Sequence, residues 1–333
     1  MIETAADFFA DSKRIIIVPC IYFTMAVAVF ALWFFGVICL ASNGTFTGSY
    51  SSQMKSVDRT ALINDRIAWM VIFYIWIATL IHALNEYTII VSACTWYFSR
   101  KDIPDDDGIP GDSDIWKGFW WSYRYNFGSL CFGSAVLTVV TIVKDAIAYM
   151  GDALVAGTAG NPITVCIMCC INCCMECFDR CVRFLTQSAY IYMALSGDSF
   201  CTSAVHAFLV VIKNAAKFSF VNSLAGFFMF MAKFSIAILT TLSCYGILKA
   251  WPSNFSGTDT NEGFVLPLIG IFILSYVICA MFIGIFDVSS NTILMCYIWD
   301  LEIAKGGKEL DPAHVPATLA KFIKIHGETV AQV

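Results

Sequence analysis

Uncharged stretches of membrane-spanning length constrain this chain more than any other feature. Residues 15–54, 67–85, 125–143 and 263–286 contain no Asp, Glu, Lys or Arg. A helix of about 20 mainly apolar residues crosses a hydrocarbon core of about 30 Å, and each stretch meets or nearly meets that length. The composition agrees, because 59% of the residues are hydrophobic and 14% are charged, whereas soluble domains are roughly half apolar and one quarter charged. The sequence therefore predicts several membrane-spanning helices.

The predicted fold class is an all-α integral membrane protein with about six transmembrane helices and a cytosolic amphipathic helix. The transmembrane domain is expected to cover residues 1–305, and a cytosolic tail residues 306–333. Charges recur at helical spacing in residues 198–218, which indicates the amphipathic helix. The predicted spans are, in chain order, 15–41, 66–99, 119–150, 163–196, 219–249 and 264–299. The chain is thus expected to be multi-pass, in the plasma membrane or an organelle membrane.

Two glycosylation sequons suggest how the spans are oriented. They begin at Asn43, in Asn-Gly-Thr, and at Asn254, in Asn-Phe-Ser, and both are expected to face the luminal side. Most Lys and Arg residues gather at the opposite ends of the predicted spans, which agrees with the positive-inside rule. Both termini are therefore expected in the cytosol.

The segments 121–150 and 163–196 leave two arrangements open. The turn at 151–162 has no Lys or Arg, which favours an outside position and hence two spans. Charges interrupt the second segment, however, and the alternative places both segments in the cytosolic interface, with four spans in total. Charged pairs are tolerated within the hydrocarbon core of the membrane where they face protein or a water-filled cavity. The interrupting charges form two i,i+4 pairs, Glu176 with Arg180 and Asp179 with Arg183.

Seven of the fifteen cysteines lie between Cys166 and Cys181. Within apolar runs, cysteines act as small packing residues. Near a membrane interface they can be S-acylated, and the candidates here are Cys170, Cys174 and Cys177. A metal site is disfavoured, because one continuous helix cannot easily surround a tetrahedral ion. We therefore predict neither a metal site nor a cofactor.

Several motifs occur in the order found in a known membrane-protein family. They are Gly128-Ser129-Leu130-Cys131-Phe132-Gly133-Ser134, the cysteine-rich segment that begins Cys166-Ile167-Met168-Cys169-Cys170, Phe200-Cys201-Thr202-Ser203-Ala204, and Asp300-Leu301-Glu302. With them the chain resembles the choline transporter-like family over roughly residues 14–305. The resemblance implies transport of choline or a related organic cation or amine without ATP hydrolysis, by uniport or in exchange for protons.

Two departures from the family pattern accompany this resemblance. Family members usually have more spans and a large first extracellular loop, so the resemblance implies that N-terminal spans are missing or that a partner subunit supplies them. The last family element has an Asp where this chain has Asn291, and an Asp stands one turn earlier at Asp287. If the family's acid takes part in coupling, that role is in doubt here or has moved one turn.

Residues that could bind a cation concentrate in the segment 66–99. A quaternary ammonium has no N–H group to donate, so aromatic faces and a nearby carboxylate bind it. This segment has one carboxylate deep in its apolar run, Glu86, with His82 at i−4 on the same helical face. The two residues could couple transport to protons, or they could form a structural polar contact. The predicted substrate-binding residues are Glu86, His82, Tyr87, Trp76, Tyr74, Trp69 and Trp96.

A second set of intramembrane charges consists of Lys233 and Asp287, in the last two predicted spans. Because consecutive spans run antiparallel, these side chains can approach each other across the two helices. Intramembrane charges usually pair with one another or serve a transport pathway, and both roles are open for this pair.

Other classes of protein find little support in the sequence. The net charge is −5 and no Lys/Arg-rich tract occurs, which argues against nucleic-acid binding. The sequence contains no P-loop, Gly-x-Ser-x-Gly or His-Glu-x-x-His motif, so we do not expect an enzyme. The alternative to a transporter is a non-transporting, truncated membrane protein that acts as a partner subunit or scaffold.

Overall fold

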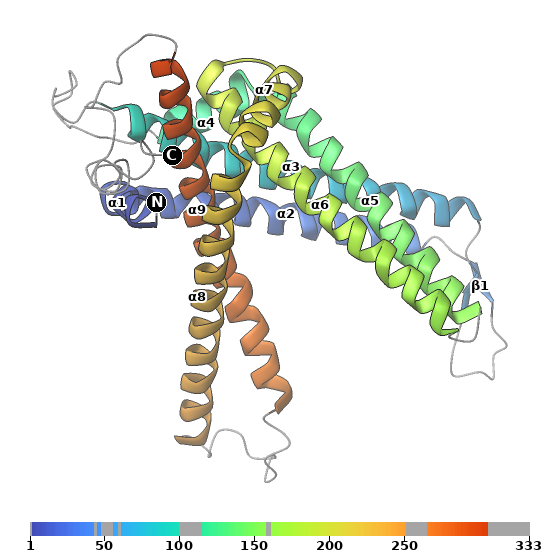
Figure 1. Ribbon diagram of the computed structural model, residues 1–333. Coiled ribbons are helices and arrows are strands. Elements are labelled where there is room, and N and C mark those ends of the chain that lie inside the picture. The colour runs from blue at the N-terminus through green and yellow to red at the C-terminus, as the bar shows by residue number, and fades with distance from the viewer. Residues whose placement is uncertain are drawn as a thin grey trace. The chain divides into compact units, whose positions relative to one another are not determined.

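The computed structural model describes residues 2–42, 45–47, 56–58, 61–99, 115–157, 161–250 and 265–305. The glycosylation candidates Asn43 and Asn254 and the tail 306–333 lie outside the described residues. The helices (Figure 1) are, in chain order, α1 (Ile2–Asp11), the 3-10 helix η1 (Lys13–Ile16), α2 (Ile17–Ala41), α3 (Ala61–Phe98), α4 (Ile115–Arg124), α5 (Phe127–Gly157), α6 (Pro162–Ser196), α7 (Phe200–Lys213), α8 (Ala215–Ala250) and α9 (Val265–Lys305).

Six helices in the described part of the chain are long and apolar enough to cross a bilayer, as predicted. They are Lys13–Ala41, Ile63–Phe98, Phe127–Gly157, Pro162–Ser196, Ala225–Lys249 and Val265–Leu301. Large apolar side chains along them are exposed, for example Leu32 at 73%, Leu239 at 64% and Leu274 at 61%. Extensive exposed apolar surface is expected where lipid surrounds a helix. The chain is thus an all-α, multi-pass integral membrane protein.

A short β-ribbon lies in the loop between α2 and α3, where the sequence did not predict strands. β1 (Thr45–Thr47) pairs antiparallel with β2 (Ser56–Asp58), and Phe46 lies opposite Val57 in the register. The ribbon has three residues in each strand, so it does not change the fold class.

The predicted span 119–150 is two helices in the structure, because the chain breaks at Asn126. α4 ends at Arg124 and α5 begins at Phe127. The Asn126 carbonyl accepts the Leu130 N–H at 2.9 Å and so starts the hydrogen bonds of α5. Asparagine favours this position, since its side chain competes with helical backbone bonds. α5 then continues to Gly157, so the predicted turn at 151–162 is shorter than expected.

The ends of α6 agree with the predicted segment 163–196. Asn161 caps the N-terminus by accepting the Ile163 N–H at 3.2 Å, and Pro162 occupies the first helical position. Gly197 ends the helix with φ of 76°, a left-handed conformation that glycine adopts without strain. After it, α7 ends at Lys213 and α8 begins at Ala215. The predicted amphipathic helix 198–218 is therefore shorter, and its last residues belong to α8.

The chain divides into two compact units. Unit 1 comprises Met1–Pro19, Ile89–Gly118 and Leu209–Val333, and unit 2 comprises Cys20–Thr88 and Phe119–Phe208. Unit 1 thus contains α1, the end of α3, α8 and α9. Unit 2 contains most of α2, α3 and α4, with α5 and α6.

In unit 1, α8 and α9 pack side by side, and α1 packs on α9 (Figure 1). The end of α3 joins α9 through a bond from Tyr97 Oη to Asp300 Oδ2 at 3.1 Å. One turn earlier, the sulfur atoms of Cys94 and Cys296 are 3.7 Å apart. These contacts place the core of unit 1 between the ends of α3 and α9.

Candidate functional site

Glu86 and His82 lie together on α3 in unit 2, as their i,i+4 spacing predicts. His82 Nδ1 is 3.7 Å from Glu86 Oε1, and the side chains are 71% and 18% exposed, respectively. Glu86 is therefore the largely buried member of the pair, and His82 is its exposed neighbour. Their proximity is a finding, whereas their role in binding stays a prediction.

Tyr190 on α6 contributes to this site from a second helix. Its Oη is buried without a hydrogen-bond partner among the described residues, and the hydroxyl interacts electrostatically with Glu86. Asn85, beside Glu86, likewise has a buried Oδ1 without a partner in the described part of the chain. Buried polar atoms are nearly always hydrogen-bonded. Each of these two oxygens is therefore a candidate partner for a water or a ligand, and the Tyr190 hydroxyl is the one that interacts with Glu86.

Gly133 on α5 gives Tyr190 the space it occupies. A Cβ atom at Gly133 would lie 2.5 Å from Tyr190 Oη and 2.9 Å from Phe200 Cε2. Neither distance is compatible with a real side chain, so the glycine lets α5 and α6 approach closely, as small residues do in membrane helices. The rings of Tyr190 and Phe200 pack with centroids 5.7 Å apart. Sequence reasoning did not select Tyr190, and its pairing with a glycine required the register of two helices.

The next residues of α3 anchor neighbouring helices. Tyr87 is fully buried, and its Oη accepts a hydrogen bond from Asn126 Nδ2 at 2.8 Å. Thr88 Oγ1 lies 3.0 Å from Tyr22 Oη of α2 and 3.3 Å from Ser122 Oγ of α4. These bonds fix the rotation of α3 within unit 2. Tyr87, a predicted substrate residue, thus has a hydrogen-bonding role at the α4–α5 junction.

The other predicted aromatic residues of α3 in unit 2 do not gather around Glu86. Trp69 is 62% exposed, Tyr74 stacks on Trp33 with ring centroids 4.6 Å apart, and Trp76 donates to the Cys131 carbonyl at 3.4 Å. At a rise of about 1.5 Å per residue, Trp76 is roughly 15 Å and Trp69 roughly 25 Å along the helix from Glu86. One small cation cannot contact all of them at once.

Trp96, near the end of α3, belongs to unit 1 and is covered by α1. Its Nε1 donates to Asp11 Oδ2 at 3.0 Å, and its ring packs edge-on against Phe8 at 5.5 Å. Both aromatic side chains are essentially buried, with 1% of Trp96 and none of Phe8 exposed. The sequence analysis predicts no helix before residue 15, so α1 as the partner of Trp96 is a finding of the structure.

Lys233 and Asp287 lie on the packed helices α8 and α9 of unit 1, as expected for adjacent spans. The two side chains are half-buried, and their charges interact electrostatically. Asn291, one turn after Asp287, is 7% exposed. The arrangement is consistent with the structural pair that the sequence left open, and a transport role for the pair stays a prediction.

A charged network joins α5 to α6 at mid-helix. Both i,i+4 pairs predicted on α6 form, with Arg183 Nε 3.0 Å from Asp179 Oδ1 and Arg180 Nε 3.6 Å from Glu176 Oε1. Sequence reasoning missed Lys144 of α5, whose Nζ is 3.1 Å from Asp179 Oδ2 and 3.4 Å from Glu176 Oε2. The network therefore connects two helices, which the pairs on α6 alone would not do.

The seven cysteines of α6 are free and exposed. Their role as small packing residues stays a prediction. Among the described residues, no group of three or more His, Cys, Asp or Glu side chains is arranged to bind a metal ion. S-acylation at Cys170, Cys174 and Cys177 stays a prediction, and all three thiols are accessible.

Comparison with known proteins agrees with the resemblance seen in the motifs. Residues 1–302 match the family described as plasma-membrane choline transporter. Choline transporter-like protein 4 of Rattus norvegicus is 28% identical over 86% of this chain and 39% of its own length. Choline transporter-like protein 2 is 26% identical in Dictyostelium discoideum, over 96% of this chain and 49% of the relative, and 26% identical in Homo sapiens, over 78% and 36%. The chain spans less than half of the length of each of these relatives.

Proposed function

The chain belongs to the plasma-membrane choline transporter family, and from that membership we propose that it moves choline or a related organic cation across the membrane, by uniport or proton exchange. The site proposed to bind the cation is the polar cluster formed by Glu86, His82, Asn85 and Tyr190. The proposal rests on one observation above all. A carboxylate within a candidate span is largely buried, and it interacts with a buried hydroxyl that has no hydrogen-bond partner in the described chain.

The energetics of the membrane interior support this choice. A charged side chain in the hydrocarbon region costs several kcal/mol unless it is paired or used, so such residues mark ion and substrate pathways. His82 on the same helix lies 3.7 Å from the Glu86 carboxylate. A positively charged ligand at this carboxylate would gain favourable electrostatics in a low-dielectric surrounding, and the Tyr190 hydroxyl, which interacts with Glu86, would contribute a polar oxygen.

Histidine suits proton exchange at this position. Imidazole can accept or release a proton in the physiological pH range, and His82 is accessible on the outer face of α3 while adjacent to Glu86. A cation at Glu86 and a positive charge on His82 would repel each other at this short separation. Competition of this kind is a physical route by which a cation could exchange for a proton.

Uptake of radiolabelled choline by cells that express the chain tests the proposal. Glu86→Gln keeps the shape of the side chain but removes its charge, and we expect a loss of uptake of about tenfold or more. Glu176→Gln is the matched control, because Glu176 is 48% exposed on α6 and belongs to the charged network instead. Surface biotinylation would verify equal amounts of each variant in the membrane.

Two outcomes would change this proposal in different ways. Equal uptake by the wild type and Glu86→Gln would remove Glu86 from the site. If the expressed chain shows no uptake above control cells, binding of choline to the purified protein decides between the remaining possibilities. Binding that depends on Glu86 would assign the chain to a larger assembly as a partner subunit, and absence of binding would reject the site.

A further inference from the structure

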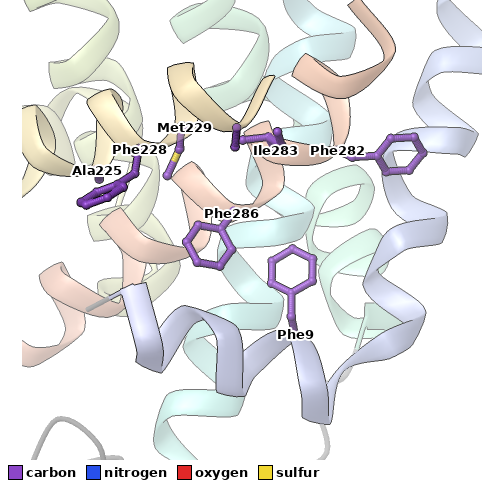
Figure 2. A pocket seen from close by; sticks show the side chains of 8 residues that line it. Phe9, Ala225, Phe228, Met229, Phe282, Ile283 and Phe286 are labelled. Carbon is purple, nitrogen blue, oxygen red and sulfur yellow. The ribbon is translucent and has the colours of Figure 1, made fainter. Parts of the chain in front are cut away.

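An apolar cavity of about 370 Å³ lies within unit 1, among α1, α8 and α9. Its lining consists of four phenylalanines, two alanines, one methionine and one isoleucine. Figure 2 shows Phe9 of α1 and Phe286 of α9 close together on one side, and their rings stack with centroids 5.7 Å apart. Met229 of α8 and Ile283 of α9 line the cavity further along (Figure 2). Among the described residues, the lining includes no polar side chain.

The cavity lies near one surface of the membrane. Its α8 and α9 residues belong to the candidate spans Ala225–Lys249 and Val265–Leu301. Its α1 residue, Phe9, comes from a helix that ends at Asp11, just before the first candidate span begins at Lys13. α1 is therefore at a membrane boundary, and the cavity extends from it along the membrane-embedded parts of α8 and α9. The cavity is open at its side, since Phe228 in its wall is 53% exposed.

The volume and the apolar lining of the cavity restrict which kind of molecule can bind there. Water gains no hydrogen bonds from an apolar lining, so it does not fill such a space. Two turns of a partner helix, about 10 Å wide and 11 Å long, would need roughly 850 Å³, more than twice the volume. A small organic cation would find no carboxylate in the lining, and the nearby charge of Asp287 already interacts with Lys233. None of these three arguments excludes a flexible hydrocarbon chain.

We propose that this cavity binds one acyl chain of a bilayer phospholipid, with the headgroup at the membrane surface beside α1. The acyl chain contacts Phe9, Met229 and Ile283 and fills space that the side chains of α8 and α9 leave open. Bound lipid then couples α1 to the α8–α9 pair, because Phe9 forms a wall of the same cavity. This lipid site is distinct from the cation cluster in unit 2 and does not depend on it.

Photo-crosslinking of a lipid to the full chain tests the assignment. The purified protein is placed in nanodiscs that contain a phosphatidylcholine with a diazirine at the end of one acyl chain, illuminated, digested and analysed by mass spectrometry. We expect the label on cavity residues, and a substitution that fills the cavity, Ala232→Phe, should reduce that label at least about fivefold. Ala232 is exposed, so the larger side chain is compatible with folding.

Leu239→Phe provides the matched control, since Leu239 is 64% exposed on the same helix and does not line the cavity. It should leave the cavity label unchanged, and both variants should elute as folded protein on size-exclusion chromatography. Cavity labelling no stronger than labelling around Leu239 would overturn the proposal. The same holds if folded Ala232→Phe keeps the wild-type level of cavity label. If Ala232→Phe does not fold, the milder Ala232→Leu takes its place with the same criterion.

Discussion

Lys144 should hold the α5–α6 hairpin together, and Lys144→Met is the substitution that tests it. The Asp179 side chain is 5% exposed and accepts from Lys144 Nζ at 3.1 Å and from Arg183 Nε at 3.0 Å. Removing one partner of a buried ion pair costs about 3–5 kcal/mol, because the other charge stays buried. Arg183 continues to compensate Asp179, so we expect a loss of about 2–3 kcal/mol in the free energy of unfolding.

Unfolding by SDS in mixed micelles, followed by tryptophan fluorescence, would measure this loss. Arg180→Met is the control, because the Arg180 and Glu176 side chains are 77% and 48% exposed and lie on one helix. Such exposed pairs contribute about 0–1 kcal/mol, so this variant should stay within that range. The two substitutions thus differ in whether the pair that they remove links α5 to α6.

A double-mutant cycle gives the sharper test of the same reasoning. If the Lys144–Asp179 contact is direct, Lys144→Met combined with Asp179→Asn should be less destabilising than the sum of the two single changes, with a coupling free energy of about 1–3 kcal/mol. Additive effects, together with a Lys144→Met loss no larger than that of Arg180→Met, would refute the idea that this network joins the helices.

Two further predictions concern helix contacts. Gly133→Ala should destabilise the protein by about 1–3 kcal/mol in the same SDS titration, because its Cβ would overlap Tyr190. Gly128→Ala, which meets no atom within 4 Å, should be neutral or stabilising by up to about 1 kcal/mol. Trp96→Phe removes the bond to Asp11 and should cost about 1–2 kcal/mol; amide hydrogen exchange should show reduced protection of α1, and unchanged exchange would contradict that docking role.

The long helices could be predicted from the sequence because one physical property decides them. An uncharged run of sufficient length has few stable alternatives to a membrane helix, so the six spans agree with the structure. The break at Asn126 was missed for a related reason. The break falls in the uncharged run 125–143, and hydropathy does not detect a local change in backbone hydrogen bonding. Only the side chain of asparagine, which competes for backbone hydrogen bonds, indicates a break there.

Contacts between helices were harder to predict than the helices themselves. The i,i+4 pairs on α6 depend only on helical geometry, and they form. Trp96 was placed in the candidate site by its residue type, but the rotation and partners of its helix direct it to Asp11. Aromatic residues spaced along a helix share a site only if neighbouring helices bring them together, and a single sequence contains no direct record of those neighbours.

The register of the α5–α6 hairpin shows which contacts between these helices could also have been predicted from the sequence. Asn161 and Gly197 mark the ends of α6, and the contacts between α5 and α6 show which residues of the two helices are level. Lys144 contacts Asp179, and Gly133, which lies 11 positions before Lys144 on α5, faces Tyr190, which lies 11 positions after Asp179 on α6. A search at that register pairs the lone lysine of α5 with the acids of α6. It also places a glycine opposite Tyr190.

Tyr190 then connects the motif that carries the family resemblance with the chemistry of the proposed site. The stretch Gly128–Ser134 contains no charged residue and offers no group that distinguishes a cation. Through Gly133, however, it makes space for a buried hydroxyl that interacts with Glu86. An alanine at Gly133 would therefore displace Tyr190, a group of the proposed cation site, without replacing any ionisable residue. In this proposal the motif on α5 acts through packing, and Glu86 on α3 supplies the charge.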